Sequence, residues 1–150
     1  MLIETVKKLI NRDLNKLIQE IESYNDERAI WKVDKGISNS AGNLCLHLIG
    51  NLNHFIGAVI GKTGYIRNRD LEFSQKDLPV AELVSKIDDT IAMINEVLPK
   101  LNEDELSNEF PLLVLNEKTT TGYFLVHLTA HLSYHLGQIN YHRRLLDRVN

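Results

Sequence analysis

Residues 125–139 read LVHLTAHLSYHLGQI, and the fold class follows from this segment. Its leucine and isoleucine residues recur every three or four positions, which places them along one face of an α-helix. This face consists of Leu125, Leu128, Leu132, Leu136 and Ile139. The threonines at 119–121 are suited to capping the first turn, so we predict a helix from there to about Asp147. A helix with one apolar face must bury that face against other elements of the chain.

The same spacing of apolar residues recurs in three further segments. We expect helices over residues 2–22, about 40–60 and about 78–98. Ser38 or Ser40 is suited to cap the second helix, because a short hydroxyl side chain accepts from the free amides of a first turn. Pro79 is suited to the first turn of the third helix.

The connectors between these helices are of unequal length. Residues 62–78 are polar and numerous enough to cross over a bundle rather than form a tight hairpin. Residues 100–118 are irregular, with a short extended piece expected at 110–115. Four amphipathic helices without a strand pattern predict an all-α fold, a four-helix bundle of up-and-down type with long connectors. We expect residues 1–150 to form a single domain.

The overall composition is that of an ordinary globular protein and argues against several function classes. The 150 residues are 43% hydrophobic and 25% charged, and the formal net charge is −3. Without a basic excess, neither nucleic acid nor an anionic membrane is expected as a partner. The single cysteine, Cys45, excludes a disulfide framework and is expected to be a small core residue. No apolar run is long enough to span a bilayer and no signal sequence is recognisable, so we expect a cytoplasmic protein.

Six histidines are present, and three of them lie four residues apart in the last predicted helix, at His127, His131 and His135. Side chains four residues apart are neighbours on one helix face, so two imidazoles can hold one metal ion. The outer two lie roughly 12 Å apart along the axis, too far to share an ion easily. Measured from the leucine face, His131 and His135 lie nearer the core, whereas His127 points outward to the surface or rim. The inner pair is the candidate for metal binding, although half-buried histidines that only hydrogen-bond their neighbours would show the same spacing.

A metal site within a helical bundle takes its ligands from helices that face one another. The second predicted helix supplies His47 and His54, which are seven residues and about 10 Å apart, so only one of them can join the inner pair. These spacings leave open which one does. His54 and His142 are expected to form a separate hydrogen-bonding layer or to be exposed.

Two of these helices carry motifs of a known family. Residues 43–52 read NLCLHLIGNL and residues 127–146 read HLTAHLSYHLGQINYHRRLL, and they resemble the second and last helices of the DinB/YfiT superfamily of proposed metalloenzymes. Residues 65–73, YIRNRDLEF, resemble a branch of it formerly described only as a domain of unknown function. The resemblance implies a four-helix bundle with a divalent metal, expected to be zinc or nickel, held by three histidines. These are His47, His131 and His135.

Three neutral imidazoles leave a divalent ion with open positions, which is the arrangement of catalytic rather than structural metal sites. No aspartate or glutamate lies within one turn of these ligands along the chain. We therefore expect the ligands to be oriented by Asn51, Gln138, Asn43 or backbone carbonyls, with no general base on these helices.

Arginines near the site are candidates for holding a substrate carboxylate. Arg143 and Arg144 lie two turns beyond the last ligand, and Arg67 and Arg69 lie on the long connector. The alternative is that they cap a helix end or pair with surface acids.

Some members of the resembled superfamily are transferases that use a low-molecular-weight thiol such as bacillithiol or mycothiol. The resemblance therefore implies a metal-dependent thiol S-transferase that acts on small electrophiles. A non-catalytic metal-binding or stress-related protein and a purely structural helical dimer module are the alternatives. The second helix has a broad apolar surface, with Ile49 and Ile60 outside its main stripe, which favours a homodimer.

Overall fold

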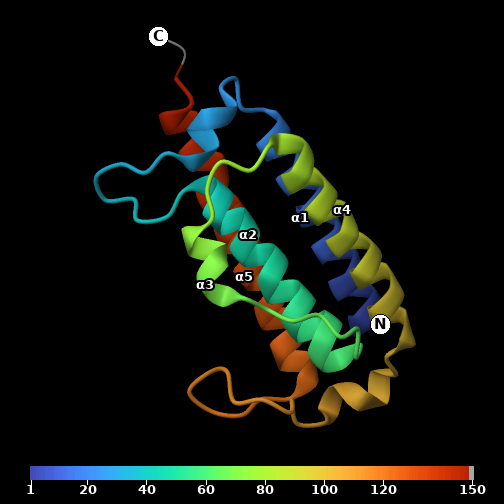
Figure 1. Ribbon diagram of the computed structural model, residues 1–150. Coiled ribbons are helices and arrows are strands. Elements are labelled where there is room, and N and C mark those ends of the chain that lie inside the picture. Colours follow the sequence, from blue (N-terminus) through green and yellow to red (C-terminus); the bar gives the residue numbers. More distant parts are fainter. Residues whose placement is uncertain (149–150) are drawn as a thin grey trace.

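Helices account for the regular structure of the described residues, 1–148, in the computed structural model (Figure 1). The α-helices are α1 (Leu2–Glu22), α2 (Ala41–Leu52), α3 (Arg69–Ser74), α4 (Val80–Val97) and α5 (Thr121–Leu146). The shorter helical segments are η1 (Glu27–Trp31), η2 (Asn53–Ile60), η3 (Leu98–Lys100) and η4 (Glu103–Ser107). η2 is a π-helix that continues α2. Residues 1–148 contain isolated β-bridges but no strand, so the extended piece predicted at 110–115 is not a strand.

α2 and α5 begin near the predicted positions because their capping side chains act as expected. The Ser40 hydroxyl accepts a hydrogen bond from the Asn43 backbone N–H at 3.1 Å. Thr120 caps α5 in the same way, by accepting from the Tyr123 backbone N–H at 3.1 Å. Ser40 rather than Ser38 is thus the cap of α2, and the all-α fold class is confirmed.

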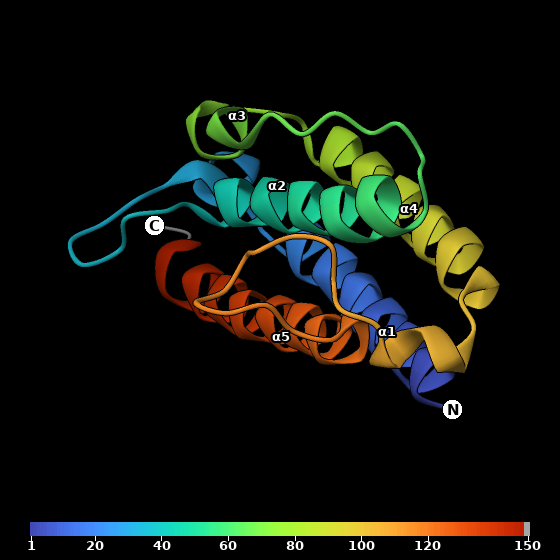
Figure 2. The same ribbon diagram turned by 90° about the horizontal axis from the view of Figure 1, so that it is seen from below.

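The directions of the four long helices differ from the predicted up-and-down order. α1 packs against α4 and α5, and α2 packs against the same two helices. α1 and α5 run in the same direction, since Tyr24 just after α1 meets His142 near the end of α5 at 2.6 Å. Figure 2 shows the connector of residues 61–79 returning along the bundle, so α2 and α4 both run the opposite way. The order is therefore up, down, down, up, with the crossover that the connector's length made possible.

α2 lies at the centre of the packing, and every one of its residues is buried. It contacts α3, α4, α5 and η1, so the chain's own elements cover its broad apolar surface. Ile49 is buried, and Ile60 packs against the core. Contacts within the chain therefore cover this surface, and its breadth no longer supports a homodimer. The homodimer stays a prediction.

By length and composition alone, the segment Ala41–Ile60 could cross a membrane, so the expectation that no apolar run is long enough does not hold. In the structure, 72% of its most apolar window is buried. Burial of this kind is typical of the core helix of a folded domain, so the segment is weak evidence for a membrane span.

His142 and His54 lie toward opposite ends of the bundle, so the predicted layer that joins them is wrong. His54 lies seven residues after His47, and His142 lies seven residues after His135. Because α2 and α5 run in opposite directions, these two steps along the chain go toward opposite ends of the bundle. His142 is instead bound between two groups near the end of α5. Its Nδ1 accepts from the Tyr24 hydroxyl at 2.6 Å, and its Nε2 donates to the Lys32 carbonyl at 2.8 Å.

We predict that His142→Phe lowers the free energy of unfolding by about 1–3 kcal/mol near pH 7, because the buried Tyr24 hydroxyl and the Lys32 carbonyl lose their partner. Burial lowers the pKa of His142 below its ordinary value of 6.5. The unfolded chain then binds more protons below about pH 6.5, so the stability contributed by neutral His142 is lost as pH falls. Urea unfolding near pH 7 and pH 5 measures both effects. The stability difference between wild type and variant should be smaller at pH 5, and a larger difference there would refute this account of His142.

Candidate metal centre

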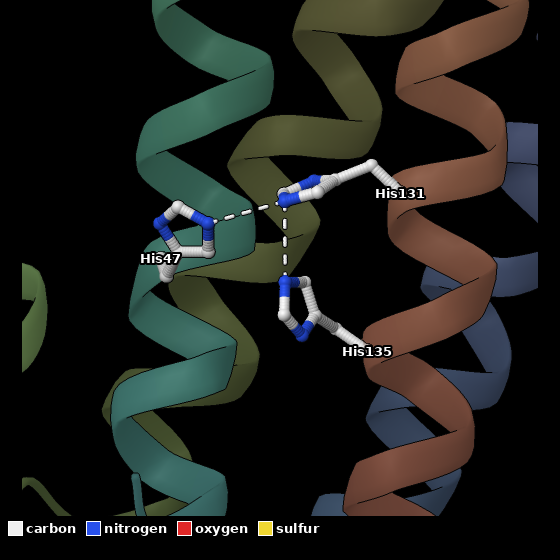
Figure 3. A group of neighbouring side chains, drawn as sticks. All are labelled: His47, His131 and His135. Atoms are coloured by element: carbon white, nitrogen blue, oxygen red, sulfur yellow. Dashed lines mark hydrogen bonds between the residues drawn. The ribbon is translucent and has the colours of Figure 1, made fainter. Parts of the chain in front are cut away.

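Three histidines from two helices converge on one point between α2 and α5 (Figure 3). α2 supplies His47, and α5 supplies His131 and His135, one turn apart. The Nε2 atoms of His47 and His135 each lie 3.2 Å from Nε2 of His131. The three ligand atoms all lie within 4.8 Å of one another. The structure thus brings together the three residues expected from the family resemblance.

Protein acceptors hold the outer nitrogens of two of these rings, which determines where their protons lie. His47 Nδ1 lies 3.0 Å from a carboxylate oxygen of Glu72, and His135 Nδ1 lies 2.7 Å from Oε1 of Gln138. Both oxygens need a hydrogen, so we assign the proton to Nδ1 and a lone pair to Nε2 of each ring. Two lone pairs then point at Nε2 of His131, which can donate one hydrogen bond at most. This surplus of lone pairs favours a cation at the centre.

A divalent cation fits among these nitrogens. Zinc binds imidazole nitrogens at about 2.0–2.1 Å, so two nitrogens of a tetrahedral site lie about 3.3–3.4 Å apart. The 3.2 Å separations are close to this value. Burial, with the nearby His135 and His47, lowers the pKa of His131 to about 4, which keeps the ring neutral and able to coordinate. Three neutral ligands leave further coordination positions open.

Glu72 on α3 supports the site, and sequence reasoning missed it. Its carboxylate accepts from His47 and from Arg67, whose Nε and one terminal nitrogen lie 2.8 and 2.9 Å from the two oxygens. Burial acts to raise the pKa of Glu72, but the hydrogen bonds from His47 and Arg67 and the Arg67 charge outweigh it and lower that pKa. The expectation that the ligands are oriented only by amides or backbone carbonyls is therefore wrong for His47. Because both oxygens are engaged, Glu72 orients His47 rather than acting as a general base.

Two residues of α2 hold Glu72 in this position. A Cβ at Gly50 would overlap the Glu72 carboxylate, so glycine is needed for α3 to approach this closely. The Asn43 side chain donates to the backbone carbonyls of Glu72 and Gln75, at 2.9 and 2.8 Å. Asn43 therefore orients the ligands indirectly, by fastening α3 to α2. The sequence did contain a signal of this contact, because a glycine inside an apolar helix, here Gly50, indicates that another segment approaches the helix closely.

The other predicted residues divide between the site and its surroundings. Gln138 accepts from Nδ1 of His135 and is placed to orient that ligand. Arg143 lines neither cavity beside the histidines; its Nε donates to Glu20 on α1 at 2.7 Å, so the predicted substrate role is replaced by pairing with an acid. Asn51 lines a cavity beside the ligands. Cys45 is fully buried, which raises its pKa to about 12, as suits a core residue.

Two cavities border the histidines. The first has a volume of about 250 Å³, and its lining includes His47 and His131. The second has a volume of about 420 Å³ and is lined by His135 with aromatic and aliphatic side chains such as Tyr141. His127 is half-buried and lines the first cavity, in keeping with its predicted place at the rim. Small molecules can therefore approach the ligand set through two separate spaces.

We predict that the chain, purified without a histidine tag, binds one divalent ion and that His135→Ala abolishes this binding, because the ligand set is then incomplete. His127→Ala is the matched control, since it removes an imidazole from the same helix but not from the converging nitrogens. Elemental analysis after loading with zinc or nickel and dialysis measures the stoichiometry. Metal retained in His135→Ala, or absent from the wild type, would overturn the site.

Glu72→Gln is expected to weaken metal affinity by about 10- to 100-fold, because the neutral amide holds His47 less firmly than the carboxylate does. Gly50→Ala should act in the same direction by displacing Glu72. Asp70→Asn removes one negative charge from an exposed position of the same helix and should leave the affinity unchanged. Competition with a chromophoric chelator measures all of these affinities. Equal affinity in Glu72→Gln and wild type would refute the orienting role of Glu72.

Comparison with known proteins places the chain in a family without naming an activity. Residues 2–150 match the family described as Protein of unknown function (DUF1572). No curated protein matches the chain. The family description does not mention DinB/YfiT, so that link stays a prediction. The match covers nearly the whole sequence, and the chain therefore belongs to the DUF1572 family.

Proposed function

We propose that the protein is a DinB/YfiT-like bundle that binds a divalent metal, zinc or nickel, and transfers a low-molecular-weight thiol to small electrophiles. The observation that carries this proposal is the convergence of His47, His131 and His135. These are the members of the candidate ligand group among the described residues, and three neutral imidazoles leave room for a substrate atom. An open site of this type supports catalysis better than a purely structural role.

A divalent ion, when bound, lowers the pKa of a coordinating thiol and so favours the nucleophilic thiolate. Glu72 and Gln138 hold the outer nitrogens of two ligands and keep their rings oriented. Both Glu72 oxygens are engaged, so the thiol proton would pass to solvent rather than to this carboxylate. In the transfer, the thiol sulfur forms a bond to the electrophilic carbon, and the leaving group departs with the electron pair of the broken bond.

The two cavities support a reaction between two small molecules. One of them borders His47 and His131, and the other borders His135. A thiol and an electrophile could therefore reach the same point from different sides without competing for one space. On the basis of composition and charge, we propose a cytoplasmic setting without nucleic-acid or membrane partners. A homodimer stays a prediction, which the breadth of α2 no longer favours.

A non-catalytic metal-binding or stress-related role is the second candidate. The observation that favours it is the absence, among the residues lining the two cavities, of any carboxylate that could act as a general base. A structural dimer module would require no converging lone pairs and is therefore the least supported of the three.

Thiol transfer to monochlorobimane, followed by fluorescence, tests the proposal with bacillithiol, mycothiol, coenzyme A and cysteine as donors. Zinc- or nickel-loaded protein should show turnover with at least one thiol. Metal-free protein and His47→Ala should show none, whereas Asp70→Asn should retain wild-type activity. Full metal occupancy without turnover for any of these thiols would contradict the transferase and favour the non-catalytic role.

A further inference from the structure

The smaller cavity beside the histidines is positively charged in a way that metal binding does not require. Arg67 and Arg69 line it together with three histidines, and none of its lining residues is acidic. Its remaining wall is largely apolar. This part of the wall includes Phe55, Phe124 and Leu128. Charged groups beside such a wall act through a lower local dielectric than they would in open water.

Arg69 carries a positive charge in this cavity that no acidic side chain of residues 1–148 balances. Arg67 is paired with Glu72, with Nε 2.8 Å from a carboxylate oxygen, so its charge is largely balanced. Arg69 is exposed, and its guanidinium lies over the Phe73 ring, 5.4 Å from the centroid. It makes no ion pair within residues 1–148. A guanidinium stacked on a ring keeps its N–H donors directed outward in its own plane, where an anion can accept from them.

The amide of Asn51 is a second sign that a ligand belongs in this cavity. Asn51 is 7% exposed and lines the cavity, and its Oδ1 has no hydrogen-bond partner in the described part of the chain. Buried polar atoms nearly always have a partner, so an unpartnered amide beside a cavity indicates a missing ligand group. The amide exchanges its oxygen and nitrogen by a half turn, and can therefore present N–H donors to an anion.

We propose that this cavity is an anion subsite that binds a carboxylate or phosphate group of a small molecule. Arg69 would supply the charge, and Asn51 would supply a neutral donor. The subsite rests on the proposed function, because the bound anion would be one end of a substrate whose reactive end reaches the histidines. A volume of about 250 Å³ suits a small charged group and not a polymer.

Isothermal titration calorimetry with malonate and with inorganic phosphate tests the subsite without any turnover. Both metal-free and zinc-loaded proteins are titrated, because an anion can also coordinate zinc directly. We expect at least one of the anions to bind both forms, and the tighter of the two identifies the preferred group. Arg69→Gln should raise the Kd about tenfold or more, and Asn51→Leu by a smaller factor.

Arg144→Gln is the matched control for the loss of a positive charge. Arg144 is also an exposed arginine stacked on an aromatic ring, 5.2 Å from the centroid of Tyr141, and it lines neither cavity. Its substitution should leave the Kd unchanged. An equal loss of affinity in Arg69→Gln and Arg144→Gln would indicate a general charge effect and overturn the subsite.

Two further results would also overturn it. One is binding of neither anion to either form. The other is binding to the zinc-loaded form alone with no effect of Arg69→Gln, which would place the anion on the ion. The experiments distinguish failure of the subsite from failure of the thiol transfer. If anion binding depends on Arg69 but no thiol transfer occurs, only the transferase proposal is contradicted. If thiol transfer occurs but no anion binds, only the subsite is contradicted.

Discussion

Lone pairs of His47 and His135 point at the same atom, Nε2 of His131, from 3.2 Å each. Without a cation this arrangement is electrostatically unfavourable, so the chain must hold the rings by their outer nitrogens and by the helices that carry them. α2 is buried on all sides and packs along α5, which fixes the separation of the two ligand-bearing helices. The packing of the bundle thus offsets a local repulsion that a bound divalent ion would remove, and such an ion would stabilise the fold.

The crossover connector supplies the carboxylate that the two ligand-bearing helices lack. α3 carries Glu72 to His47, and Arg67 precedes Glu72 by five residues, so one short segment brings both the carboxylate and its cationic partner. Gly50 gives the room for this contact, and Asn43 anchors the segment on α2. The connector between α2 and α4 is long because it returns along the bundle (Figure 1), and on its way back it brings Glu72 of α3 to the ligand His47. The orientation of His47 and the charge of the adjacent cavity both depend on it.

The helices and the inner histidine pair could be read from sequence, because both depend on local spacing. α5 and its cap at Thr120 follow from apolar residues three and four apart after a run of threonines. α3 could not be found in this way, since six residues are too few to show a period. The layer expected from His54 and His142 failed because its reasoning assumed that both helices continue in the same direction from the site. They run in opposite directions, and His142 binds Tyr24 instead.

Sequence was thus sufficient for the all-α class, the approximate bounds of the long helices, and the pairing of His131 with His135 on one face. These features depend on residues within a few positions of each other, where backbone geometry leaves little choice. The partnership of His47 with Glu72, the commitment of Arg143 to Glu20 and the order of helix directions appear only in the folded chain. Each of these depends on which distant segments meet, and that is settled by packing of the whole core rather than by any local pattern.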